Sequence, residues 1–277
     1  MFRLGTGRRA GYPIYRYLPA KRLTPADTHS EIMEVALVTV GDELLAGDTE
    51  NTNASWLGRQ LTAAGASVAR VLTVPDDEAV VADTVARYRD AFDAVIVTGG
   101  IGGTPDDITK AAVARAFDRD LVVPDDVRAH LEAKAERFAE DNPELVDRYD
   151  MDLDLDAWAS VPEGGQPLLT DESFAAGCVV DSVYVMPGIP EELRAMYETV
   201  ADEFDGDRTT ETLHTPAPEG ALVSRVTEAR ERFGVAVGSY PRKDDAPGRV
   251  KVTGEDAAAV TEAAAWLRER IETVDGE

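Results

Sequence analysis

The most concentrated chemical signal in the sequence is the segment Thr98–Lys110, which reads TGGIGGTPDDITK. Four glycines in five positions allow the backbone to turn sharply and to approach a ligand closely. The N–H groups of such a loop, together with the start of a following helix, can bind a phosphate group. Asp106 and Asp107 can cap that helix, or hold a divalent cation that bridges a carboxylate and a phosphate. The candidate ligand-binding residues here are Thr98, Gly99, Gly100, Gly102, Gly103 and Thr104.

The glycine loop alone is not diagnostic. It matches neither the Walker loop nor the dinucleotide-binding pattern, and an isolated glycine loop is more often a plain turn. Its context favours a ligand site, because a buried strand precedes it, a helix is expected after it and paired acids follow it. Lys110, close behind the acids, is placed to assist electrostatically.

A second candidate loop follows the apolar run Val35–Val40. Its two carboxylates suit a metal ion or the hydroxyl groups of a ribose, and its two asparagine amides suit the polar edge of a ligand. The same residues also fit an ordinary strand-to-helix loop, in which Asn51 or Thr52 caps the helix. The sequence leaves both interpretations open for Gly41, Asp42, Glu43, Asn51 and Asn53.

Two shorter segments follow other expected strands. Asp76 stands at the carboxyl end of the second strand, where it can face Asp107 across a cleft, although Asp76 or Asp77 also suits the cap of the next helix. Pro187 and Gly188 begin a turn into a helix and are candidate ligand-binding residues, although the turn considered alone is structural. The candidate metal ligands are Asp76, Asp106 and Asp107.

Short apolar runs rich in β-branched residues alternate with helical segments, which predicts an α/β fold. The expected strands are Val35–Val40, Ala66–Val74, Ala94–Val97 and Val183–Met186, and the expected helices are 51–65, 77–90, 107–117, 125–156 with a break at Pro143, and 191–204. Short connections imply a mostly parallel sheet with helices on both faces, a three-layer αβα sandwich. Ligands bind such sheets at the carboxyl ends of the strands, so the candidate loops are expected at one edge.

The chain is expected to divide into three parts. Residues 33–205 form the α/β domain, and residues 206–277 form a small α+β domain with the order βαββα and an antiparallel sheet. Residues 1–32 are expected to be a disordered or spurious extension before a natural start at Met33. Because the first 30 residues hold six cations and one acid, a basic arm that binds a partner is the alternative.

Composition restricts the function classes. The formal net charge of −25, from 28 Lys+Arg against 53 Asp+Glu, repels nucleic-acid backbones and disfavours a general DNA or RNA binder. The low lysine content resembles that of proteins from salt-loving organisms. The single cysteine, Cys178, excludes an internal disulfide, and the three scattered histidines disfavour a structural zinc site. No apolar run is long enough to span a bilayer, so we expect a cytoplasmic protein.

Taken together, these motifs resemble the molybdopterin-binding domain superfamily, and within it the CinA-like (competence/damage-inducible protein A) family of nucleotide-utilising proteins. The likeness covers about residues 33–204 and rests on four segments that occur in order: 40–53, 98–110, 157–169 and 186–192. Residues 237–241 resemble part of the small domain that follows this module in CinA-like proteins and in eukaryotic FAD synthases.

The resemblance implies a three-layer α/β fold that is often oligomeric. Some members bind or adenylylate molybdopterin, and others hydrolyse the pyrophosphate of ADP-ribose or FAD with a divalent metal. It places the acidic site positions at Asp76 and Asp107 and Lys110 at a position often occupied by lysine. It places the glycine loop at Gly99, Gly100 and Gly102. Gly103 stands where the family usually has proline, which implies a more mobile loop. No nicotinamide-nucleotide deamidase domain follows the small domain in this sequence, so we expect no deamidase activity.

From these observations we expect a metal-dependent pyrophosphatase of an ADP-containing nucleotide, with Asp76, Asp107 and Lys110 as catalytic residues. Mg²⁺ or Co²⁺ is the expected metal, with K⁺ as a further candidate ion. The alternatives are molybdopterin binding or adenylyl transfer in molybdenum cofactor biosynthesis, and a non-catalytic nucleotide-binding regulatory module. The expected partners are a small nucleotide or pterin and further copies of the chain, and neither nucleic acid nor a membrane.

Overall fold

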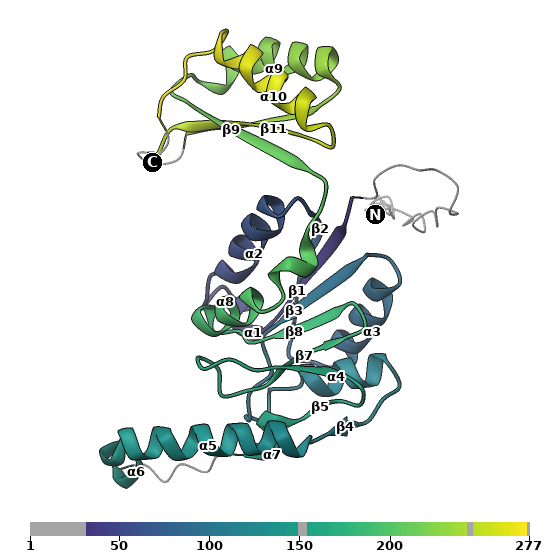
Figure 1. The fold of residues 1–277 in the computed structure, drawn as a ribbon, viewed down its shortest axis with the longest axis vertical. Coiled ribbons are helices and arrows are strands. Elements are labelled where there is room, and N and C mark those ends of the chain that lie inside the picture. Colours follow the sequence, from purple (N-terminus) through teal and green to yellow (C-terminus); the bar gives the residue numbers. More distant parts are fainter. Residues whose placement is uncertain (1–31, 149–153, 243–245, 276–277) are drawn as a thin grey trace, which may run out of the picture.

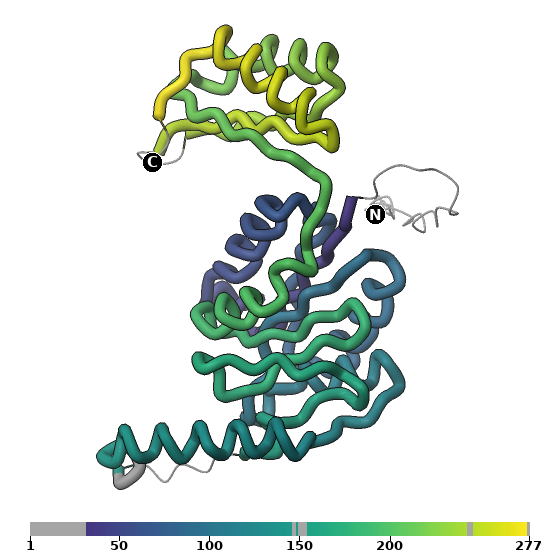
Figure 2. Tube along the Cα trace, in the orientation of Figure 1, coloured from purple at the N-terminus to yellow at the C-terminus, as the bar shows by residue number. Residues whose placement is uncertain are grey.

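The structure is a computed structural model that describes residues 32–148, 154–242 and 246–275, and Figure 1 shows its two units. The expectation for the N-terminal extension therefore lies, up to residue 31, outside the described residues. The larger unit is built on a six-stranded sheet and the smaller one on a three-stranded sheet. The chain path in Figure 2 passes from the larger unit to the smaller one through a short connection between residues 204 and 209.

The six-stranded sheet has the order β2-β1-β3-β8-β7-β6. Its strands are β1 (Glu34–Val40), β2 (Ser67–Val74), β3 (Ala94–Thr98), β6 (Gln166–Leu168), β7 (Gly177–Val180) and β8 (Val183–Met186). The neighbours β2, β1, β3 and β8 pair in parallel, and β7 and β6 continue the sheet by antiparallel pairing. The chain moves outward from β1 to β2 and returns on the other side of β1 as β3, so the strand order reverses between β1 and β3. The predicted mostly parallel sheet is confirmed.

Helices cover both faces of this sheet (Figure 1). The helical elements of the larger unit are α1 (Asp42–Ala46), α2 (Thr52–Ala63), α3 (Glu78–Arg89), α4 (Thr109–Ala116), α5 (Asp125–Asp141), α6 (Pro143–Arg148), α7 (Leu155–Ala159), α8 (Pro190–Glu198) and the 3-10 helix η1 (Ala201–Phe204). The two-residue strands β4 (Leu121–Val122) and β5 (Val161–Pro162) pair with each other outside the main sheet.

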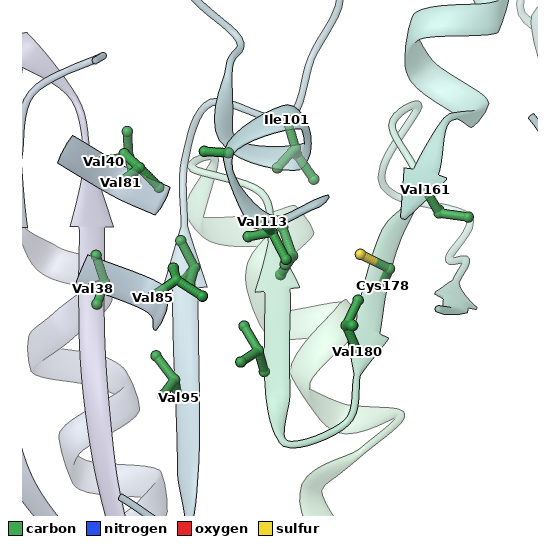
Figure 3. Close-up of a cluster of buried hydrophobic side chains, with 14 of the residues drawn as sticks. Val38, Val40, Val81, Val85, Val95, Ile101, Val113, Val161, Cys178 and Val180 are labelled. Carbon is green, nitrogen blue, oxygen red and sulfur yellow. The ribbon is translucent and has the colours of Figure 1, made fainter. Parts of the chain in front are cut away.

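Alternation along the buried strand β1 creates the two hydrophobic layers. Ala36, Val38 and Val40 pack with residues of α3 and α4 in one cluster, which also contains Cys178 (Figure 3). Val35 and Leu37 point the other way and pack with residues of α2 and α8. A strand buried on both faces needs apolar residues at every position, so its sequence is a continuous apolar run. The predicted three-layer αβα sandwich is therefore confirmed.

Side-chain caps fix where the helices begin. The side chain of Asn51 accepts a hydrogen bond from the N–H of Ala54 and caps α2, and Asp77 caps α3 in the same way. The expectation that Asp106 or Asp107 caps the helix after the glycine loop is wrong. Helix α4 begins at Thr109 without a side-chain cap, because Asp107 instead turns back toward the loop.

Three further features were not predicted. Helix α1 lies in the segment expected to be a loop, and it ends at Gly47 in the left-handed conformation with φ 78°. Strands β6 and β7 are three and four residues long. Such short strands carry too few residues to show a period in the sequence, and their existence depends on pairing with β8.

The smaller unit has the predicted order βαββα. Its elements are β9 (Thr209–Thr215), α9 (Glu219–Phe233), β10 (Ala236–Tyr240), β11 (Gly248–Gly254) and α10 (Ala257–Arg268). The sheet is antiparallel with the order β10-β11-β9. Val250 and Val252 of the central strand are buried with residues of both helices, so α9 and α10 cover one face of this sheet. In Figure 1 the two helices lie on the side away from the larger unit.

The connection between the units is held by a backbone contact at two glycines. The N–H of Gly206 donates to the carbonyl oxygen of Ala64 at 2.8 Å, and the N–H of Arg208 donates to that of Gly65 at 3.2 Å. Gly65 has φ 90°, and a Cβ there would overlap the carbonyl oxygen of Gly206. The turn between α2 and β2 thus needs glycine at this position.

We predict that Gly65→Ala lowers the free energy of unfolding by about 1–3 kcal/mol, because alanine must adopt a left-handed conformation and also displaces the connection. Urea denaturation measures this change. Gly220→Ala in α9 is the matched control, since nothing lies within 4 Å of the added Cβ, and it should leave the stability unchanged or slightly raise it. Equal stability of the two variants would contradict the role given to this contact.

Candidate functional site

A cavity of about 420 Å³ opens at the carboxyl ends of the parallel strands. Gly41 follows β1, Asp76 follows β2, Gly99 follows β3 and Pro187 follows β8, and all four residues line it. The cavity lies beside the point where the strand order reverses between β1 and β3. In α/β proteins this is the position at which small ligands bind.

Most of the predicted site residues are brought together on the cavity wall. These are Gly41, Glu43, Asn51, Asn53, Asp76, Thr98, Gly99, Gly100, Gly102, Asp106, Asp107, Pro187 and Gly188. Four others do not line it: Asp42, Gly103, Thr104 and Lys110. The structure therefore divides the predicted set into residues that can meet a ligand and residues that support them.

Two glycines give the loop after β3 its shape. Gly99 has φ 96°, and a Cβ there would overlap the carbonyl oxygen of Val40 at the end of β1. Gly100 has φ 64°, and a Cβ there would lie 2.6 Å from Oγ1 of Thr109. Both positions combine a left-handed backbone with a close approach, so no other residue fits without strain.

The loop presents unpaired backbone donors. The N–H of Gly99 donates to the carbonyl of Met186, and the N–H of Thr104 donates to Asp107. Between them, the N–H groups of residues 100–103 donate no hydrogen bond within the described part of the chain. Backbone donors need an acceptor, from water or from a ligand, and consecutive free N–H groups suit the oxygens of an anion.

Asp107 is fixed by the loop that it follows. Its Oδ2 accepts hydrogen bonds from the N–H and Oγ1 of Thr104, at 2.8 and 2.6 Å. A Cβ on Gly102 would lie 2.6 Å from the same oxygen, so the carboxylate packs directly on the loop backbone. Gly103 in turn packs against the indole of Trp158. Thr104 and Gly103 therefore act as supports for the loop rather than as parts of the cavity wall.

Asp76 joins the second strand to the loop after the first. Its Oδ2 accepts a hydrogen bond from the N–H of Asp42 at 2.8 Å. Because Asp77 caps α3, Asp76 has no capping role, and within the described residues its carboxylate accepts no other hydrogen bond. Asp42 contributes through its backbone, while Glu43 contributes its side chain to the wall.

The two asparagines have structural partners. Asn51 caps α2 with its oxygen and donates its amide to Oγ1 of Thr39 at 2.9 Å, so both ends of its side chain are used. Asn53 donates to the carbonyl oxygen of Gly188 at 2.6 Å and connects α2 to the turn after β8. Of the two interpretations of this pair, ordinary capping accounts for Asn51, and Asn53 positions the opposite wall.

The structure corrects the expectation for Lys110. Its side chain is 3% exposed and points into the protein, where Nζ donates to the carbonyl oxygens of Ala157 at 2.6 Å and Trp158 at 3.1 Å. Burial lowers the pKa of Lys110 to about 8. Lys110 therefore attaches α4 to the last turn of α7 and does not reach the cavity. The position of Lys110 in its helix does not predict this burial, because the residues of α7 that it contacts are distant in the sequence.

The predicted metal ligands line one cavity but do not form a closed site. Among the described residues, no group of three or more His, Cys, Asp or Glu side chains is arranged to hold a metal ion. Asp76, Asp106 and Asp107 all lie on the wall. A magnesium-like ion keeps several waters and takes one or two protein carboxylates together with phosphate oxygens, so this donor set fits a cation shared with a ligand and does not fit a structural metal.

Glu192 in α8 is a wall residue to which the sequence analysis gave no role. Its Oε2 accepts a hydrogen bond at 2.7 Å from Oγ of Ser173, which is buried. Lys134 donates to the carbonyl oxygen of Ser173 at 2.8 Å and anchors this segment. Burial raises the pKa of Glu192. In the sequence Glu192 is one of two acids at the start of a helix. Only its contact with the distant residue Ser173 distinguishes it from its neighbour Glu191.

The fold and the cavity are those of α/β proteins that have a small-molecule cavity at the switch point of a parallel sheet. The family described as "Probable molybdopterin binding domain" matches residues 36–205. The chain belongs to this molybdopterin-binding family, and its relatives place it among the CinA-like proteins. Residues 208–275 are similar to the family described as "FAD synthase, middle domain".

The relatives extend over both units. A protein of Archaeoglobus fulgidus is 34% identical over 241 residues, which cover 86% of this chain and 97% of that relative. A CinA-like protein of Gemmatimonas aurantiaca is 35% identical over 86% of this chain, which spans 58% of that relative's length. The crystal structure of CinA from Thermoplasma acidophilum is similar with a TM-score of 0.54 and 28% identity, and the match covers 62% of this chain and 98% of that one.

The described helices also bear on membrane insertion. None of the helices within residues 32–148, 154–242 and 246–275 has the length and apolar character needed to cross a membrane.

We predict that Glu192→Gln stabilises the protein at neutral pH but not in acid. The folded state raises the pKa of this carboxyl, so its stabilising contribution is present below the unfolded pKa and is lost as the pH rises through the folded pKa. Glutamine keeps an acceptor for Ser173 without the buried charge. Urea denaturation at pH 4 and pH 7 measures the difference. Glu191→Gln, at the exposed neighbouring residue, is the control for the loss of one charge from the same helix turn. If Glu192→Gln changed the stability equally at both pH values, Glu192 would not have the raised pKa given to it here.

We predict that Lys110→Met destabilises the fold by about 2–4 kcal/mol, because it leaves two buried carbonyl oxygens without a donor. Thermal or urea unfolding measures this loss. Arg115→Gln in the same helix is the control, since Arg115 forms an exposed ion pair with Glu78 that contributes at most about 1 kcal/mol. A Lys110→Met variant as stable as the control would show that Lys110 has no such anchoring role.

Proposed function

We propose that the chain is a metal-dependent hydrolase that splits the diphosphate of an ADP-containing nucleotide, such as ADP-ribose or FAD. The observation that carries this proposal is the run of unpaired N–H groups at residues 100–102, which line the same cavity as Asp76 and Asp107. Free N–H groups favour phosphate oxygens, whereas carboxylates repel them. A cation shared between the carboxylates and the phosphates would neutralise this repulsion.

Asp76 and Asp107 are the residues that would hold the cation. Both are already fixed by hydrogen bonds from the backbone, Asp76 from Asp42 and Asp107 from Thr104, so little side-chain ordering is needed on binding. When bound, a divalent cation neutralises the diphosphate and lowers the pKa of a coordinated water. Asp106, also on the wall, is exposed and serves as a further acidic neighbour.

The other wall residues supply the remaining parts of a hydrolysis. A water molecule attacks one phosphorus atom, the bond from that phosphorus to the bridging oxygen breaks, and the bridging oxygen leaves with the second phosphate. The N–H groups of residues 100–102 stabilise the charge that develops on the non-bridging oxygens. Glu192 is the wall carboxyl suited to accept the proton of the water, because burial raises its pKa above that of an exposed glutamate.

The similarity of residues 208–275 to the middle domain of FAD synthase supports a dinucleotide of the FAD type as substrate. It concerns the smaller unit, while the cavity belongs to the larger one. ADP-ribose shares the ADP portion and the diphosphate, so the same cavity chemistry serves both compounds.

A second candidate function is molybdopterin binding or adenylyl transfer. The match of residues 36–205 to the molybdopterin-binding family favours it, and a pterin phosphate needs the same free N–H groups. A non-catalytic nucleotide-binding module is the third candidate. The three functions differ in what appears when nucleotide, molybdopterin and metal are supplied: AMP release, pterin binding, or nucleotide binding without turnover.

We predict that the purified protein, in concentrated KCl with Mg²⁺ or Co²⁺, releases AMP from ADP-ribose or FAD. Asp76→Asn and Asp107→Asn should each lower the rate by about a hundredfold, since each removes one charge from the cation site. Asparagine retains an oxygen that can accept the hydrogen bond from Asp42 at position 76 and from Thr104 at position 107, so the fold should persist. Chromatography of the products measures AMP.

The matched control is Asp83→Asn, which removes one exposed charge from α3 outside the cavity and should leave the rate unchanged. Absence of AMP with every metal, or full activity of Asp107→Asn, would exclude the hydrolase. Tight binding of ADP-ribose without turnover would then support the non-catalytic module, and binding of molybdopterin alone would support the second candidate.

A further inference from the structure

A second cavity, also of about 420 Å³, lies at the junction of the two units. Ser67 and Val68 of β2 and Thr62 of α2 line it from the larger unit. From the smaller unit it is lined by the face of the three-stranded sheet opposite α9 and α10, and also by Val237 of the covered face and by Arg230 of α9. It has no lining residue in common with the cavity at the glycine loop. The junction cavity is therefore separate from the site of the proposed hydrolase.

The charge of the junction cavity is opposite to that of the chain as a whole. Arg208, Arg230 and Lys251 line it, and its lining contains no aspartate or glutamate. In a sequence with 53 acids and 28 cations, three cations without an acid in one cavity is a local reversal of sign. Such a reversal attracts anions in spite of the negative field of the rest of the molecule.

These cations are available to a ligand. Arg208 donates through Nη1 to Oγ of Ser67 at 3.1 Å, but its Nε is buried and has no hydrogen-bond partner in the described chain. Within the same described residues, none of Arg208, Arg230 and Lys251 forms an ion pair with a carboxylate. Buried guanidinium donors are normally satisfied, so an unpaired one indicates a missing acceptor.

An aromatic ring lies beside the cations. Tyr240 lines the cavity and is 46% exposed. A Cβ at Gly238 would lie 3.1 Å from atoms of the Tyr240 ring, so the ring rests on the backbone where glycine leaves space. Lys251 Nζ and Arg249 Cζ lie 6.0 and 5.9 Å from the ring centroid. An exposed ring beside cations is the combination that recognises a nucleotide, since bases stack on aromatic faces and phosphates pair with cations.

We propose that the junction cavity binds a nucleoside monophosphate, with its phosphate on Arg208, Arg230 and Lys251 and its base against Tyr240. The volume suits one mononucleotide and not a polymer, and the net charge of −25 opposes a nucleic-acid strand. Because both units contribute to the cavity, the ligand contacts both and holds them in one relative position. The junction is thus a second nucleotide site, separate from the glycine loop.

The test uses a reporter placed in the cavity itself. The full chain is labelled with 3-fluorotyrosine, and the ¹⁹F signal of Tyr240 is assigned by its absence in Tyr240→Phe. We expect AMP to shift this signal in a saturable way. Ribose 5-phosphate should compete with AMP, since it carries the phosphate, whereas adenosine should bind at least about tenfold more weakly than AMP because it lacks the charge-assisted hydrogen bonds.

The double variant Arg230→Gln/Lys251→Gln should weaken AMP binding by about tenfold or more. Arg225→Gln, which removes an exposed cation of α9 outside the cavity, is the control and should bind AMP as the unmodified protein does. Thermal unfolding of each variant checks that both units remain folded. If the double variant does not fold, the single variant Arg230→Gln replaces it, and this variant should still weaken AMP binding.

Three results would overturn the proposal. The Tyr240 signal could remain unchanged at millimolar AMP. Binding could be equal in the double variant and the control. A hexa-adenylate strand could bind more than about tenfold more tightly than AMP, which would identify a nucleic-acid surface in place of a mononucleotide site.

Discussion

At the candidate site the backbone of Gly99 passes so near the end of β1 that no Cβ fits beside the carbonyl oxygen of Val40. The strands β1 and β3 are neighbours in the sheet, but β2 lies between them in the sequence and on the other side of β1 in the sheet. The loop after β3 must therefore cross close to the end of β1. Glycine allows this crossing, and the N–H groups of the residues that follow donate to no partner among the described residues.

Several distant contacts of the larger unit hold this loop in place. Thr104 and Asp107 close its second half, Trp158 supports Gly103, and Lys110 fixes the helix behind it to α7. The opposite wall is held by Asn53, which reaches the carbonyl oxygen of Gly188. Apart from the local pair of Thr104 and Asp107, each contact joins segments that are separated in the chain, so the cavity is a property of the whole αβα sandwich. A rigid cavity wall lowers the entropic cost of ordering the groups that meet a ligand.

Lysine has an unusual distribution in this acidic protein. Of five lysines in the sequence, Lys110 and Lys134 are buried, and both donate to carbonyl oxygens of neighbouring segments. Lys251 lines the junction cavity. The ammonium groups that the structure describes thus hold loops together or face a cavity, while arginines such as Arg115 and Arg128 form the exposed ion pairs. Acidic side chains near both buried lysines, among them Asp107 for Lys110 and Glu192 for Lys134, favour the charged ammonium groups.

The sequence predicted the fold well where the signal is local. β1, β3 and β8 are continuous apolar runs, and the caps Asn51 and Asp77 mark their helices directly. It failed where the determining contact is distant. Lys110 resembles a cavity residue because its partners in α7 are distant in the sequence, and Glu192 is distinguished only by its hydrogen bond from Ser173. Asp107 is a different case, because a helix cap and a hydrogen bond from Thr104 are both local and the sequence does not decide between them. The glycine loop was found because one segment contains all of its determinants.

The environment of Cys178 has a practical consequence. It is the single cysteine of the sequence, it is fully buried between the sheet and its helices, and burial raises the pKa of its thiol to about 12. At neutral pH the thiolate, which is the reactive species, is nearly absent. A cysteine engineered onto either unit would consequently be the sole thiol to accept a maleimide or nitroxide. Dye pairs or spin labels on the two units could then report their separation without first removing the native sulfur.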